Sequence, residues 1–189
     1  MTSKTTISRD PLLFAILLLV GLVGPSTAAP KEAAMESVSR PEAGLTIVAG
    51  SQPPLAVQGP DAAGRPLFAP PDGASLFLAV DVRAQKGNKN GFGAGEFVPY
   101  LSVSYRARRQ DGGDAGHGQL HPLVTRDGMR YGNNVRLPGP GAYTITLTID
   151  PPVKVGFGRH TDLETGVSRW WNPVQVEWTL THPAPKGSR

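Results

Sequence analysis

The chain has 189 residues and not one cysteine. This absence excludes a disulfide framework, a lipid-modified cysteine, a cysteine nucleophile and a thiolate metal site. A domain without these devices is held together by its hydrophobic core. The chain beyond its N-terminal segment, roughly 160 residues, is long enough for one domain with a good buried fraction.

The chain also lacks a hydrophobic run that could cross a membrane. Its longest apolar run, "LLFAILLLVGLVG" at residues 12–24, falls short of the roughly 20 residues of a spanning helix. The run follows Lys4 and Arg9 and precedes the small residues "PSTAAP". A charged start, a short apolar core and a small-residue cleavage sequence are typical of a secretory signal peptide. We therefore predict a signal peptide over residues 1–28, cleaved near Ala28, and an exported protein; an uncleaved anchor is the alternative.

Motifs of catalysis and of nucleic-acid binding are missing as well. The formal net charge is +4, and the basic residues are spread along the chain rather than gathered in a stripe. The sequence contains no "GxSxG", no "HExxH" and no phosphate-binding loop. The carboxylates Glu96, Asp150 and Glu164 lie in separate turns, and no spacing pairs an acid with a base. We predict a protein that is not an enzyme and does not bind nucleic acid.

Alternation of apolar and polar residues is what the chain does contain. It is typical of half-buried antiparallel strands, and glycine- and proline-rich turns separate its stretches. The stretches are "SLFLAVDVRA", "EFVPYLSVSYRAR", "GAYTITLTID" and "PVQVEWTLTH". The pattern predicts an all-β sandwich over residues 73–182. Residues 29–72 are rich in Pro, Ala and Gly and are predicted to be an N-terminal extension with one short strand, "LTIVAG"; residues 183–189 are predicted to be a flexible tail.

Longer motifs in the same region carry a family resemblance. They are "GNKNGFGAGEFVPYLSVSY", "DGMRYGNNVRL", "GAYTITLTIDPP" and "GFGRHTDLETGVSRWWNPVQVEW", in this order. With them the chain resembles the periplasmic iron-transport proteins, which accompany high-affinity iron permeases in bacteria. The resemblance implies a periplasmic location, an immunoglobulin-like antiparallel β-sandwich, a homodimer, and a copper site of histidine and methionine that supports iron uptake.

Most copper-ligand positions of that family are replaced in this sequence. The resemblance places a His and a Glu where this chain has Phe77 and Ala79, and a Met and a His where it has Leu123 and Arg130. The remaining ligand is kept as His160. A single imidazole does not hold copper or iron tightly, because a metal site needs several converging donors. We therefore expect copper or iron to bind weakly, at an altered site, or not at all.

Other residues suggest what an altered site would contain. His121, Met129 and His160 form a nitrogen and sulfur set suited to copper(I). A guanidinium cannot ligate a metal, so Arg130, together with Arg159, instead indicates contact with an anion or a ferric chelate. The alternative for each residue is structural: Met129 as a packing residue, His121 on an exposed strand, and His160 in a hydrogen-bonded surface loop.

The loop that contains His160 leads into Trp170 and Trp171, and adjacent strand residues point to opposite sides. One tryptophan is therefore expected inside and the other outside, as a contact for a dimer or another partner.

The resemblance implies an accessory protein that binds a metal ion or metal chelate and works with an inner-membrane iron permease. A degenerate interaction module of the cell envelope that binds no metal is the alternative; a carbohydrate- or peptide-binding sandwich that uses Trp170 or Trp171 is the weaker third one.

Overall fold

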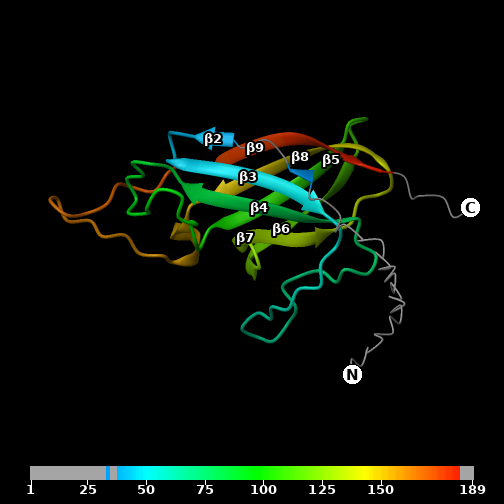
Figure 1. The fold of residues 1–189 in the computed structure, drawn as a ribbon, viewed down its shortest axis with the longest axis horizontal. Coiled ribbons are helices and arrows are strands. Elements are labelled where there is room, and N and C mark those ends of the chain that lie inside the picture. Colours follow the sequence, from blue (N-terminus) through cyan, green and yellow to red (C-terminus); the bar gives the residue numbers. More distant parts are fainter. Residues whose placement is uncertain (1–32, 35–37, 184–189) are drawn as a thin grey trace, which may run out of the picture.

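A computed structural model describes residues 33–34 and 38–183, and their fold is all-β (Figure 1). The predicted signal peptide and residues 184–189 lie outside the described residues. The strands are β1 (Ala33–Ala34), β2 (Val38–Arg40), β3 (Leu45–Gln52), β4 (Leu76–Ala84), β5 (Ser102–Arg109), β6 (Asp114–Thr125), β7 (Gly128–Val135), β8 (Gly141–Asp150) and β9 (Val174–His182). One short 3-10 helix, η1 (Pro152–Val155), follows β8.

The strands form one continuous antiparallel path in the order β1-β3-β4-β7-β6-β5-β8-β9, and β2 pairs with β3. The long strand β6 connects the two halves, because its first part pairs with β5 and its last part with β7. The path curls until its ends approach: Arg40 Nη2 on β2 donates a hydrogen bond to the Gln175 carbonyl on β9 (3.1 Å). The predicted all-β class is confirmed, as a nearly closed sheet.

The core fills the inside of this curled sheet. Alternation along each strand sends one set of side chains inward, as the sequence predicts for β4, β5, β8 and β9. Inward residues on opposite halves share one cluster of buried apolar side chains. Its largest fully buried members are Tyr131, Tyr143, Leu45, Ile47, Leu78, Ile145, Leu147, Ile149, Val80, Val82 and Val98.

The sheet begins within the segment predicted as an N-terminal extension. The expected short strand is present as β3, which is longer than "LTIVAG" and pairs with β4 from Leu45 to Gln52. Leu45, Ile47 and Ala49 are buried in the main cluster. At the end of β4, Gln85 Nε2 donates to the Leu45 carbonyl (2.7 Å). Residues 45–52 are therefore an integral part of the sheet.

Strand β6 begins in a stretch, "QDGGDAGHG", that the sequence pattern predicts to be a turn. Its glycines explain the difference. Gly118 lies directly opposite Tyr105 on β5, and a Cβ there would come within 3.0 Å of the tyrosine ring. A glycine therefore allows the two backbones to pair beside a bulky side chain, although glycine is otherwise unfavourable within strands.

In the described part of the chain, no helix has the length and hydrophobicity of a transmembrane segment.

Candidate functional site

The four replaced positions at which the resemblance implies copper ligands share one outer face of the sheet, formed by β4, β7 and β6. Register decides this, because directly opposite residues of antiparallel strands point to the same side. Ala79 lies opposite Gly132, which lies opposite His121, and Leu123 lies opposite Arg130. Phe77 shares the face by alternation along β4. We call this surface the β4–β7–β6 face.

Residues 53–72, between β3 and β4, cover one end of this face; we call them the strap (Figure 1). Asn134 on β7 holds it at both ends. Its Oδ1 accepts from the Leu55 amide (3.0 Å), and its Nδ2 donates to the carbonyls of Leu55 (2.8 Å) and Ala69 (2.7 Å). The buried ring of Phe68 packs edge-on against His121, with ring centroids 5.6 Å apart. Burial by these contacts lowers the pKa of His121.

Phe77 fills the space beneath the strap. Its side chain is fully buried, yet Phe77, Phe68 and Ala79 lie outside the main core cluster. The ring of Phe77 occupies the notch above Gly132: a Cβ at Gly132 would overlap this ring and lie 2.9 Å from the Leu78 carbonyl oxygen. The β4–β7–β6 face therefore has a small hydrophobic core of its own.

These residues do not fit a copper ion. The positions carry an aromatic ring, a methyl group, an isobutyl group and a guanidinium, none of which is a metal donor. In residues 33–34 and 38–183, no group of three or more His, Cys, Asp and Glu side chains is placed to hold a metal ion. A tight metal site at the usual family positions is therefore not supported.

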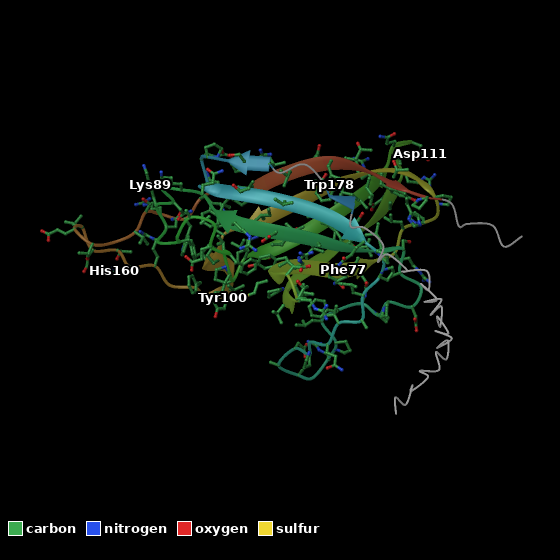
Figure 2. All side chains as sticks on the ribbon, in the orientation of Figure 1. Phe77, Lys89, Tyr100, Asp111, His160 and Trp178 are labelled. Atoms are coloured by element: carbon green, nitrogen blue, oxygen red, sulfur yellow. The ribbon has the colours of Figure 1, made fainter. Side chains whose placement is uncertain are left out.

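The structure does not bring His121, Met129 and His160 together, contrary to the altered site predicted from the sequence. Met129 lies opposite Val124, so it points to the other side of the β6–β7 hairpin from His121. Its side chain is exposed. His160 lies at the far end of the molecule from Phe77, which shares the β4–β7–β6 face with His121 (Figure 2). Strand alternation therefore separates Met129 from His121, and the position of the loop separates His160 from both.

His160 belongs to a long loop that protrudes from the sheet, residues 156–170, which we call the arm (Figure 1). His160 Nε2 lies 3.0 Å from Asp162 Oδ2, and both side chains are largely exposed. Arg159 Nη1 donates to the Val167 carbonyl (2.7 Å), and the Val167 amide donates to the His160 carbonyl (3.0 Å). These bonds shape the arm as a hairpin-like loop. Leu163 at its tip is fully exposed.

Aromatic residues gather where the arm joins the sheet. Trp171 is buried and Trp170 is half-buried and packs against the core cluster, with ring centroids 5.7 Å apart; both lie before β9 rather than on a strand. The ring of Phe157 stacks on Tyr100 at 4.8 Å. Tyr100 is 57% exposed and has a φ of 60°, which is uncommon for a residue with a side chain. No sequence pattern identifies Tyr100 as part of this surface.

Fold and site together define an all-β protein whose β4–β7–β6 face is closed by hydrophobic packing and whose arm carries the one retained histidine. The model of the Fe2+ transport protein family matches residues 44–183, so the chain belongs to this family. This confirms the resemblance described above.

Relatives of known sequence or structure agree with this assignment. A UPF0423 protein of Brucella abortus is 41% identical over 119 residues, which cover 61% of this chain and 65% of the relative, less than two thirds of its length. FetP of uropathogenic E. coli strain F11, expressed in the periplasm, is 38% identical with a TM-score of 0.70, over 80% of this chain and 95% of FetP. Copper-reconstituted P19 of Campylobacter jejuni is 32% identical with a TM-score of 0.73, over 82% of this chain and 99% of P19.

Proposed function

We propose that the chain is a periplasmic accessory protein of iron uptake, which binds iron as a chelate and works with an inner-membrane iron permease. The family match over residues 44–183 is the observation that carries this proposal. The N-terminal sequence, which has the features of a signal peptide, supports export. In this proposal the immunoglobulin-like sandwich is the scaffold, with the β3–β4 and β5–β8–β9 parts of the sheet as its layers around one core.

Relatives of this chain have been solved with copper. P19 was solved as a copper-reconstituted protein, and a variant of FetP as a copper-bound one. Here the corresponding face carries Phe77 and Arg130, so a bare copper or iron ion would bind only weakly. A chelate brings its own donor atoms, so its recognition needs anion and hydrogen-bond contacts rather than metal ligands.

The same replacements favour a second candidate, an envelope interaction module that binds no metal in any form. One experiment separates the two. The mature protein would be melted with copper(I), copper(II), iron(II) or ferric citrate, and radiolabelled iron uptake would be measured in cells with and without the protein.

We expect ferric citrate at about 100 times its Kd to stabilise the native state by about 2.7 kcal/mol, and so to raise Tm by several degrees. Uptake should fall when the protein is deleted, and crosslinking in cells should capture the permease. If no ion or chelate shifts Tm and uptake is unchanged, the interaction module is the correct function.

A homodimer joined through the arm is also part of the proposal. Leu163 is fully exposed at the tip of the protruding arm, where it is within reach of a contact with a partner. Leu163 would make this contact, with the aromatic residues around Trp170 and Trp171 behind it and with Arg159 and His160 carried toward the partner's surface.

We expect Leu163→Ser to weaken the dimer by about tenfold or more, because a buried leucine at an interface contributes roughly 1.5–3 kcal/mol. Analytical ultracentrifugation over a concentration series measures this. Val124→Ser is the matched control, since Val124 is also highly exposed but lies on the β6–β7 hairpin. Equal association of both variants would contradict the arm as the interface.

A further inference from the structure

A second surface, on the other half of the sheet, has the chemistry of a binding site that the functional residues above do not include. It is the outer face of β6, β5, β8 and β9, and it forms an open hollow of about 670 Å³. We call it the polar hollow. Its lining side chains are almost all polar: Ser104, Tyr105, Arg106, Arg108, His117, Gln119, Thr146, Thr148, Gln175 and Glu177.

Strand register arranges the polar hollow in cross-strand rows. His117, Arg106, Thr146 and Glu177 are successive partners across β6, β5, β8 and β9. The neighbouring row consists of Gln119, Ser104, Thr148 and Gln175. Because directly opposite residues share a face, hydroxyl and amide groups form a continuous strip beside the arginines.

The charges of the polar hollow are unevenly distributed. Arg106 is exposed, and among the described residues its side chain has no hydrogen-bond or ion-pair partner. Arg108 Nη2 makes a 3.3 Å bond to the Gly112 carbonyl. The only acid of the lining, Glu177, lies at the β9 end of its row and accepts from Thr146 Oγ1 (2.7 Å). One side of the polar hollow is therefore cationic and its middle is rich in hydrogen-bonding groups.

This arrangement matches a particular ligand class. A guanidinium binds carboxylates and phosphates in its plane, with charge-assisted hydrogen bonds. Serine, threonine and glutamine side chains both donate and accept, so they suit hydroxyl groups. The volume lies within the range of small-molecule sites, roughly 300–1,000 Å³. The complementary ligand is a small, anionic and hydroxylated molecule.

We propose that the polar hollow binds the iron chelate as a ferric hydroxycarboxylate, with Arg106 and Arg108 on its carboxylates and the Ser104–Thr148–Gln175 row on its hydroxyl and remaining oxygen atoms. This inference rests on the proposed function and names the class of its substrate and the place where it binds. The iron keeps its ligands throughout, so no protein side chain replaces them.

Calorimetric titration of the mature protein with ferric citrate, iron-free citrate and inorganic phosphate tests the inference. We expect ferric citrate to bind most tightly. Arg106→Ala should raise its Kd by about tenfold, the effect of losing one hydrogen bond to a charged group. Glu177→Gln should lower the Kd by about two- to fivefold, because it removes a like charge from the rim. An improvement of this kind cannot come from a loss of folding.

Arg126→Ala is the matched control, because it removes the same charge from the turn of the β6–β7 hairpin, outside the polar hollow. Its Kd for ferric citrate should be unchanged. Equal loss in Arg126→Ala and Arg106→Ala, or phosphate binding as tight as that of ferric citrate, would overturn the inference in favour of general anion attraction.

The inference and the proposed function can fail separately. If iron uptake depends on the protein but ferric citrate binds equally well to wild type, Arg106→Ala and Glu177→Gln, the assignment of the polar hollow is wrong and the accessory function stands. If uptake does not depend on the protein and no chelate binds, both are wrong.

Discussion

Phe77→Ala is expected to lower the free energy of unfolding by about 3–5 kcal/mol, the usual cost of removing a buried aromatic ring. Phe77 is fully buried, and its ring fills the notch over Gly132 beneath the strap. The strap is fixed at Leu55 and Ala69 by Asn134, so it can collapse into the space only in part. Denaturant unfolding followed by tryptophan fluorescence measures the change.

Val124→Ala is the control for this experiment, since Val124 is 78% exposed and its truncation should change stability by less than about 0.5 kcal/mol. A loss below about 1 kcal/mol for Phe77→Ala would mean that the ring is not a structural element. The expected large loss would show that a position which carries a metal donor in the family resemblance now holds the strap to the sheet. The substitution that removed a metal donor at position 77 would then also have supplied the hydrophobic packing there.

Alternation predicted the regular strands well, and the reason is physical. Residues 141–150 alternate without interruption, and β8 covers the same residues. Each of its inward side chains enters the core, so the pattern records burial directly. The same argument holds for β9. On β4 the inward residues also enter the core, but the outward Phe77 and Ala79 are buried as well.

Strand β6 and the strap were not predictable in this way. Gly118 of β6 is required by a neighbour, Tyr105, which lies on another strand. The strap covers its face through Asn134 and Phe68, and neither residue belongs to a periodic pattern. In both cases the deciding contact is tertiary, and a single sequence does not contain it.

Some features of the candidate site could also be predicted from the sequence, and others could not. The sequence shows that Phe77 and Ala79 carry no metal donor, and the structure adds that both side chains are buried, which the sequence analysis did not predict. The trio with Met129 was wrong because adjacent pairs on two strands alternate faces. The polar hollow was missed because its rows join residues from four strands, and outward polar residues of a strand look the same whether or not a ligand uses them.

Tyr131 joins the sheet to the loop that carries the exposed aromatic residues. Its side chain is fully buried, and its hydroxyl donates to the Val98 carbonyl (2.8 Å) and accepts from the Leu101 amide (3.0 Å). Tyr131→Phe leaves both backbone groups buried without this partner, so we expect a loss of about 2–3 kcal/mol at neutral pH. The loop from Val98 to Leu101 contains Tyr100, and its stacking on Phe157 should weaken as well.

Alkaline pH separates the hydrogen bonds of Tyr131 from its packing. Burial raises the pKa of Tyr131 from about 10 to about 12. Because the folded pKa is the higher one, the stabilisation is complete below pH 10 and is lost as the pH rises through 12. A shift of this size corresponds to about 2–3 kcal/mol. The unfolding free energies of wild type and Tyr131→Phe, measured from pH 8 to 12, should therefore converge.

Burial also raises the pKa of Tyr105, but this residue is present in both proteins, so its effect cancels in the comparison. Parallel curves would mean that Tyr131 ionises at the same pH in the folded and the unfolded chain, and the loop to Leu101 would then be held by ring packing on Phe97 rather than by the hydroxyl.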